Sequence, residues 1–263
     1  MVSREVLESI RRLLDGERLG AVATVVAGPD VGAKAVLDAE AGWIAGSLPA
    51  EVAGDVAADA GELMGFEQNR TLQYGEREVF IETVAPPPHL LIFGAVHIAQ
   101  PLTTFAVHLG FRVTVCDARP AFITPERFPD ADEVVVGWPG EVLDRLTIDR
   151  RTFVVLLVHD ARYEDPVFPV LHHQPVRYIG AMGSRRTHRL RRERLAGQGW
   201  TDEELDRIHG PVGLDIGAET PEEMAIAILA EMIQVRYGSG TGLSLKGTDG
   251  RIHAQRTDDP GDV

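Results

Sequence analysis

The segment Gly94-Ala95-Val96-His97-Ile98-Ala99 is the first place where residue types and spacing suggest binding chemistry. It follows the pattern G-x-G-x-x-G/A, whose small residues turn a strand into a helix and let a pyrophosphate approach the helix N-terminus. Gly94 and Ala99 fit the first and third positions, whereas Val96 places a β-branched side chain at the second. Gly94, Val96 and His97 are therefore candidate cofactor contacts, but Val96 opposes the usual dinucleotide pose.

Polar residues also follow two apolar segments. Asp117 comes after Val113–Cys116, roughly 20 residues beyond the turn, where the dinucleotide pattern places an acidic ribose contact. The alternative is that Asp117 merely ends a strand of a scaffold. His159 and Asp160 are expected outside the end of a strand, where ligands of open α/β sheets gather, and can serve polar contacts or proton transfer. The alternative for this pair is a loop histidine and a helix-starting aspartate.

Gly183-Ser184-Arg185-Arg186 predicts an anion site. Ser184 is a typical helix N-cap, and the first backbone N–H groups of a helix attract negative charge. In a chain of formal net charge −14, the window from 185 to 194 is the one basic concentration. It holds Arg185, Arg186, Arg189, Arg191, Arg192 and Arg194. This pattern predicts binding of a phosphate or an acidic partner surface; the alternative, especially for the outer arginines, is a solvated helix face.

The run before the last long helix contains two unexplained acids. Thr220 and Glu223 predict a capping box, and Pro221 suits the first helical position. Asp215 and Glu219 have no such structural role, so they are further candidate cofactor contacts.

No catalytic residue or metal site is predicted. The chain has one cysteine, Cys116, and we expect it to be a small buried hydrophobe of a strand. No Ser-His-Asp order, metal-ligand spacing or phosphate-loop lysine is present.

Composition excludes several classes of protein. Of the 263 residues, 44% are hydrophobic, which is enough for a real core. The strong negative charge argues against a nucleic-acid partner and against docking on anionic lipid. No apolar run reaches about 18 residues, and the N-terminus lacks the apolar region of a signal peptide. We therefore expect a cytoplasmic protein.

The periodicity predicts two kinds of architecture. Residues 1–85 combine helical spacing over 3–15 and 49–64 with short strands, which indicates a small α+β domain. Pro86–Pro88 is the predicted linker. Residues 89–238 alternate apolar strands and helices, which predicts an α/β, Rossmann-like parallel sheet. The strands are expected at 90–93, 112–116, 133–136, 152–158 and 176–179, and the helices at 98–109, 140–146, 184–198 and 221–235. Residues 239–263 are predicted to be a disordered tail.

The chain resembles the XdhC/CoxI family, accessory proteins of xanthine dehydrogenase and carbon monoxide dehydrogenase. The resemblance is carried by Leu91–Ala99, Val113–Phe122, Tyr178–Arg186 and above all by the long run Ile208–Glu223. Leu19–Val26, Val31–Lys34 and Ile44–Ser47 are similar to the family's smaller N-terminal domain, so the resemblance covers about residues 3–238.

This resemblance implies a maturation factor rather than an enzyme of a metabolic step. Family members bind molybdenum cofactor, protect it while a cysteine desulfurase installs its terminal sulfur, and deliver it to a molybdenum hydroxylase. The chain departs from the family after Gly46-Ser47, where Leu48-Pro49-Ala50-Glu51 replaces a Ser-Gly-Gly-Cys segment. It departs again at Val96, which is usually glycine in the family.

Our leading hypothesis is a cytoplasmic maturation factor that binds molybdenum cofactor. The expected partners are a client hydroxylase, a cysteine desulfurase and a second copy of the chain. The expected site comprises Gly94, Val96, His97, Asp117, His159, Asp160, Gly183, Ser184, Arg185, Arg186, Asp215 and Glu219. Two alternatives remain: an NAD(P)-dependent oxidoreductase, favoured by Asp117 and opposed by Val96, and an interaction protein that kept the fold and lost the ligand.

Overall fold

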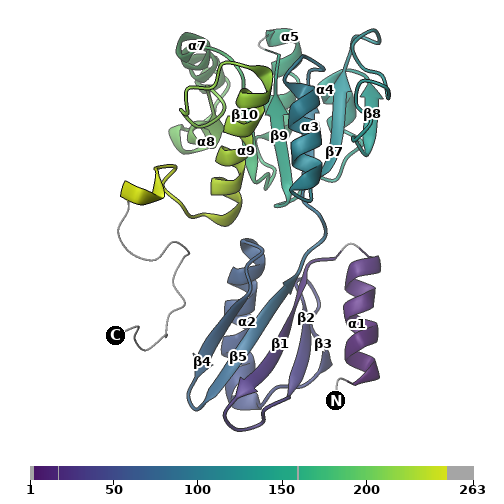
Figure 1. The fold of residues 1–263 in the computed structure, drawn as a ribbon, viewed down its shortest axis with the longest axis vertical. Helices are drawn as coiled ribbons and strands as arrows, with labels where there is room; N and C mark the ends of the chain where they lie inside the picture. The colour runs from purple at the N-terminus through teal and green to yellow at the C-terminus, as the bar shows by residue number, and fades with distance from the viewer. Residues whose placement is uncertain (1–2, 17, 159, 248–263) are drawn as a thin grey trace. The chain divides into compact units, whose positions relative to one another are not determined.

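The computed structural model describes residues 3–16, 18–158 and 160–247 (Figure 1). The chain divides into two compact units. The first runs to Pro86 and includes the segment that begins at Leu243, and the second is Pro87–Gly242. Of the predicted tail, residues 239–247 are described and contain a short 3-10 helix at Leu245–Gly247; the remainder lies outside the described residues.

The first unit is a five-stranded antiparallel sheet with strand order β3-β2-β1-β5-β4. Side chains alternate across a strand, so β1 serves two cores: Ala21, Ala23 and Val25 pack toward α2, and Val22 packs toward α1. This arrangement confirms the predicted α+β pattern. The elements are α1 (Arg4–Asp15), β1 (Gly20–Ala27), β2 (Lys34–Asp38), β3 (Gly42–Gly46), α2 (Ala50–Gly65), β4 (Arg70–Tyr74) and β5 (Arg77–Val84).

The second unit is a six-stranded sheet in the order β11-β10-β9-β6-β7-β8, with every neighbouring pair parallel. Numbered within the unit, this is the doubly wound order 3-2-1-4-5-6 read from its other edge. The predicted Rossmann-like sheet is therefore confirmed. The strands are β6 (His89–Phe93), β7 (Arg112–Asp117), β8 (Glu133–Val136), β9 (Thr152–Leu156), β10 (Tyr178–Ala181) and β11 (Ile208–His209).

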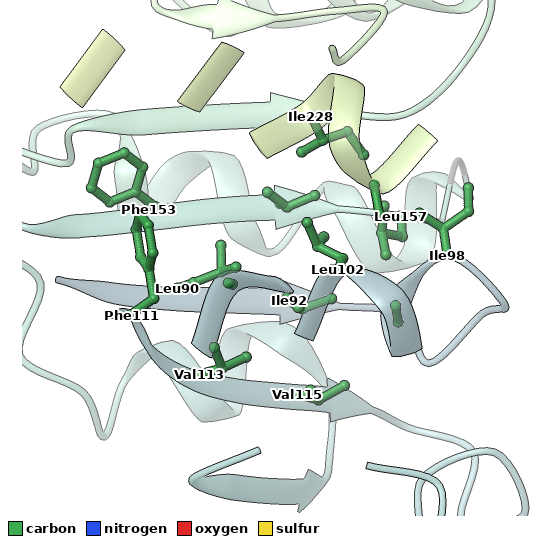
Figure 2. Packing of buried hydrophobic residues seen from close by; sticks show 14 of the residues in the cluster. Leu90, Ile92, Ile98, Leu102, Phe111, Val113, Val115, Phe153, Leu157 and Ile228 are labelled. Atoms are coloured by element: carbon green, nitrogen blue, oxygen red, sulfur yellow. The ribbon is translucent and has the colours of Figure 1, made fainter. Parts of the chain in front are cut away.

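Helices cover both faces of this sheet. On one face, α3 and α9 pack Leu102 and Ile228 against Ile92, Val115 and other strand residues (Figure 2). On the other face, α4, α6, α7 and α8 contribute side chains to a second apolar cluster. Strands covered on both sides need continuous apolar runs, so the strands of this unit could be predicted from the sequence. The helices are α3 (Ala99–His108), α4 (Pro139–Leu143), α5 (Ala161–Glu164), α6 (Val167–Leu171), α7 (Arg185–Ala196), α8 (Asp202–Asp206) and α9 (Pro221–Tyr237).

The N-terminus of α9 confirms the predicted capping box. Thr220 accepts from the Glu223 backbone, the Glu223 side chain accepts from the Thr220 backbone, and Pro221 occupies the first turn. Among the described residues, no helix, α9 included, is long and apolar enough to cross a membrane.

The sequence interpretation was wrong in detail at short elements. It missed α5, α6, α8 and β11, which have two to five residues each, because so few residues show no periodicity. The strand expected at 176–179 is observed at Tyr178–Ala181, so its end lies closer to Ser184 than predicted.

Candidate functional site

The predicted anion site opens on a cavity of about 530 Å³. One wall is Ser184–Arg186 at the N-terminus of α7, and the other is Pro211–Gly213 with Asp215, from the loop after β11. Four of the sequence candidates, Ser184, Arg185, Arg186 and Asp215, therefore lie around one space at the carboxyl ends of the strands, where ligands of this fold bind.

The helix terminus is built as an N-cap. The Ser184 hydroxyl accepts from the Thr187 backbone N–H at 3.1 Å. Within the described residues, no acceptor is bonded to the backbone N–H groups of Arg185 and Arg186. These two donors carry the partial positive charge of the helix end into the cavity.

The arginines of α7 fall into two classes. Arg191 and Arg194 bind Glu164, and Arg192 binds Asp206, so these cations are neutralised by neighbouring helices. By contrast, Arg185 and Arg186 are exposed and make no ion pair or hydrogen bond within the described part of the chain. The basic window is therefore mostly structural, and its uncompensated charge lies at the cavity.

Arg191 also connects the helix to the end of β10. Its side chain is 1% exposed, and besides binding Glu164 the guanidinium donates to the Met182 carbonyl at 2.8 Å. Because Met182 follows β10 and precedes Ser184, this buried network sets the direction in which the N-terminus of α7 points.

A second cavity of about 190 Å³ continues from the first, because Val212 and Asp215 line both. Its walls are mainly apolar and come from the end of β10, the loop before α9 and α9 itself. The apolar members include Met182, Leu214, Ile216, Met224 and Ile228. The site therefore has a cationic part and an apolar part, with one carboxylate between them.

The loop between β11 and α9 is fixed to α9 by the partly buried carboxylate of Glu231. Glu231 accepts from the Gly213 N–H at 3.0 Å and from the Tyr178 hydroxyl at 2.5 Å. His209 Nδ1 lies 3.3 Å from its other oxygen. Burial would raise the pKa of Glu231, but these contacts outweigh it, and the net pKa is lowered. One ionised side chain therefore holds both ends of residues 209–213.

Gly213 allows this close seating. Its φ is +100°, and a Cβ there would lie 3.3 Å from the Ala227 backbone. The next residue, Leu214, donates its N–H to the Ala227 carbonyl at 3.1 Å. The cavity wall is thus bonded directly to the helix backbone.

We expect Glu231→Ala to speed hydrogen exchange at the Gly213 amide by about 10-fold, because losing a hydrogen bond to a charged group costs about 1.5 kcal/mol or more. Glu231→Gln keeps an acceptor of the same shape and should have a smaller effect. Glu222→Ala, an exposed site on the same helix, is the control. Unchanged exchange at Gly213 in Glu231→Ala would contradict the assigned clamp.

The turn after β6 has the geometry expected of a Rossmann unit. Gly94 has φ +113°, and a Cβ there would lie 2.4 Å from Val158 Cγ2, so glycine is required. Val96 is half-buried and packs against the core of the unit, while His97 is exposed. None of the three lines the cavity beside α7.

Asp117 does not fit the ribose contact offered by the sequence. The side chain is fully buried. One oxygen accepts from the Ala95 N–H at 2.8 Å, and both accept from the Arg119 guanidinium at 2.9 and 2.7 Å. Because these donors already occupy the carboxylate, Asp117 braces the turn after β6 rather than facing a ligand.

The remaining candidates lie elsewhere. Asp160 is the N-cap of α5 and binds the backbone and side chain of Arg162, which is the structural alternative left open by the sequence. His159 lies outside the described residues. Gly183 adjoins Ser184, whereas Glu219 is exposed and lines neither described cavity.

Cys116 is a buried residue of β7, as predicted. Its side chain is 1% exposed, and its thiol donates to the Gly137 carbonyl at 3.3 Å. Burial, with the nearby charges of Asp117 and Glu141, raises the pKa of the thiol to about 12. Cys116 is therefore not a thiolate at neutral pH.

A histidine pair stands apart from these cavities. Ligand atoms of His172, His173 and Glu204 lie within 4.8 Å of one another. The His172 ring is stacked on His173, with 22° between the planes, and on Trp200, with 8°. Nearly parallel stacked rings do not direct their lone pairs at one point, so this arrangement packs α6 against α8.

Sequence reasoning missed Pro211–Gly213 and Glu231. The loop residues carry no side chain that suggests binding. Glu231 did leave a signal, because it lies three residues after Ile228 and four after Ala227, on the apolar side of an otherwise core-forming helix.

With this geometry in place, comparison with known proteins identifies the second unit. The family model of the XdhC Rossmann domain matches residues 90–232 of this chain. The chain belongs to the XdhC family. The matched range contains the residues that line both cavities and the contacts of Glu231 with the loop after β11, so the candidate site lies in the XdhC Rossmann domain.

Curated relatives match part of this chain. A Bacillus subtilis protein, named as a probable subunit of xanthine dehydrogenase, is 36% identical over 159 residues, which are 60% of this chain and 46% of the relative. The molybdenum cofactor insertion chaperone PaoD of Escherichia coli is 32% identical over 151 residues, 57% of this chain and 41% of the relative. The chain therefore matches less than half the length of each.

A solved structure from Bacillus halodurans, described as a xanthine dehydrogenase, shares the fold. It is 21% identical, with a TM-score of 0.54, and the match covers 92% of this chain and 98% of that one. At this identity the likeness concerns the fold alone.

Proposed function

We propose that this XdhC protein binds molybdenum cofactor and holds it for insertion into a molybdenum hydroxylase. The observation that carries the proposal is the cavity beside α7, where Arg185 and Arg186 are exposed and unpaired within the described residues. The relative PaoD, named as a molybdenum cofactor insertion chaperone, supports the same role.

The site residues fit a phosphate-bearing pterin. Two guanidinium groups and two backbone N–H groups provide donors for a phosphate. The adjoining apolar cavity offers a place for a planar ring system. When bound, the cofactor would supply the redox-active metal centre of the client enzyme, and this chain's part is to bind, orient and shield it.

In this proposal a partner protein, and not this chain, carries out the sulfuration of the cofactor. Cys116 is the chain's one cysteine, and its thiol is buried and held protonated by its raised pKa. No residue of the chain therefore offers a thiolate to carry sulfur. A cysteine desulfurase acting on the held cofactor would provide that step.

Wild-type protein mixed anaerobically with molybdenum cofactor should retain it through gel filtration, and the Arg185→Ala/Arg186→Ala variant should bind it about 10- to 100-fold more weakly. The matched control is Arg150→Ala/Arg189→Ala, which removes two exposed arginines outside the cavity lining. Affinity can be read from the cofactor-dependent rise in melting temperature, since a ligand that binds the native state stabilises it.

Three results would contradict the proposal. No retention by wild type, with no ligand-induced rise in melting temperature, would favour an interaction protein that has lost its ligand. Equal retention by the Arg185/Arg186 variant would remove the assigned site. Micromolar binding of NAD(H) or NADP(H) in calorimetry, without cofactor retention, would favour the oxidoreductase alternative.

A further inference from the structure

Opposite charges line the first cavity without neutralising one another. Asp215 shares that lining with Arg185 and Arg186. Within the described residues it forms no ion pair or hydrogen bond. The cavity therefore offers an anion site and a separate acceptor of hydrogen bonds.

The position of Asp215 relates this acceptor to the apolar cavity. Asp215 and Val212 are the residues common to both linings, and the second cavity continues along Met182 and Met224. Thioether side chains pack favourably against aromatic rings. A flat ring held there would have one edge near the carboxylate, while a phosphate attached to it could reach the N-terminus of α7.

We propose that Asp215 selects the 2-amino-4-oxopyrimidine ring, which pterins and guanine share. This ring presents a ring N–H and an amino N–H side by side, and a carboxylate accepts such a pair with its two oxygens. The adenine edge presents one donor beside one acceptor, so one carboxylate oxygen would face the lone pair of a ring nitrogen. This repulsion lowers the affinity for adenine relative to guanine or a pterin. The inference rests on the proposed function and adds which part of the ligand the site recognises, namely the pyrimidine edge of the pterin.

Guanosine and adenosine monophosphates test this selection, because they share a phosphate and a purine and differ in the edge. Wild type should bind GMP about 10-fold more tightly than AMP in calorimetry, the worth of one charge-assisted hydrogen bond. Asp215→Asn should abolish that preference without weakening the affinity for inorganic phosphate, because the substitution removes a negative charge from the lining of the cavity.

Glu219→Gln is the matched control, because it removes one negative charge from the same loop outside both linings and should keep the preference. Equal or absent binding of both nucleotides by wild type, or a preference that survives in Asp215→Asn, overturns the inference. The proposed function is read separately: retention of molybdenum cofactor without a GMP preference overturns only the role of Asp215, whereas a GMP preference without retention overturns only the proposed function.

Discussion

Glu164→Ala should destabilise the second unit by about 3–5 kcal/mol, the usual cost of removing one partner of a buried ion pair. The Glu164 and Arg191 side chains are 3% and 1% exposed, so the arginine would be left charged and without its carboxylate. Arg194 would lose the same partner. Urea unfolding followed by tryptophan fluorescence in a Trp43→Phe background would measure the loss through Trp138 and Trp200.

Two companion variants isolate the cause. Glu193→Ala removes an exposed partner of Arg189 on the same helix and should change stability by less than about 0.5 kcal/mol. Glu164→Ala/Arg191→Met removes both buried charges and should recover much of the loss, because apolar replacements of buried pairs are often tolerated. A loss below about 1 kcal/mol in Glu164→Ala would show that this ion pair does not hold α7.

Asp117→Ala should cost about 2–3 kcal/mol at neutral pH, because the buried N–H of Ala95 loses its acceptor. Arg119 is 41% exposed and can turn to water, so its loss of a partner adds little. Asp130→Ala, which removes an exposed hydrogen bond from Thr104, is the control and should be nearly neutral. A stability equal to wild type would mean that the turn after β6 does not depend on this brace.

The Asp117 effect should depend on pH in a defined direction. Burial would raise the pKa of this carboxyl, but hydrogen bonds from Arg119 and from the Ala95 backbone outweigh it, so the pKa in the folded state is lowered. A lowered pKa contributes stability above the pKa of the unfolded state, and this is lost as pH falls through the folded value. The difference between wild type and Asp117→Ala should therefore shrink below about pH 4.

The architecture of the second unit could be predicted because its signals are local. Leu90–Phe93 and Thr152–Leu156 are continuous apolar runs, as strands covered on both faces require. Gly94, Pro221 and the Thr220–Glu223 box mark where strands or helices begin and end. The short helices α5 and α6 escaped because four or five residues cannot show a 3.6-residue period.

The candidate site could be predicted only in part. Ser184, Arg185 and Arg186 were found because a cap and a basic cluster are visible in adjacent residues. The wall opposite them was missed, since Gly213 is held by Glu231, 18 residues away, and no local pattern connects the two. For Asp117, the same pattern predicts a ribose contact or a brace of the turn, and the bond to Ala95 distinguishes them.

The sequence by itself determined the order of the longer strands and helices, the caps of α7 and α9 and the place of the basic window, because these depend on interactions among residues a few positions apart. The tertiary structure decided which charges are available to a ligand. The acids that neutralise Arg191, Arg192 and Arg194 lie on α5 and α8, and only packing brings them to α7. Whether a charged side chain is paired depends on the residues that the fold brings next to it. Arg185, Arg186 and Asp215 could therefore be distinguished from other charged residues only in the folded chain.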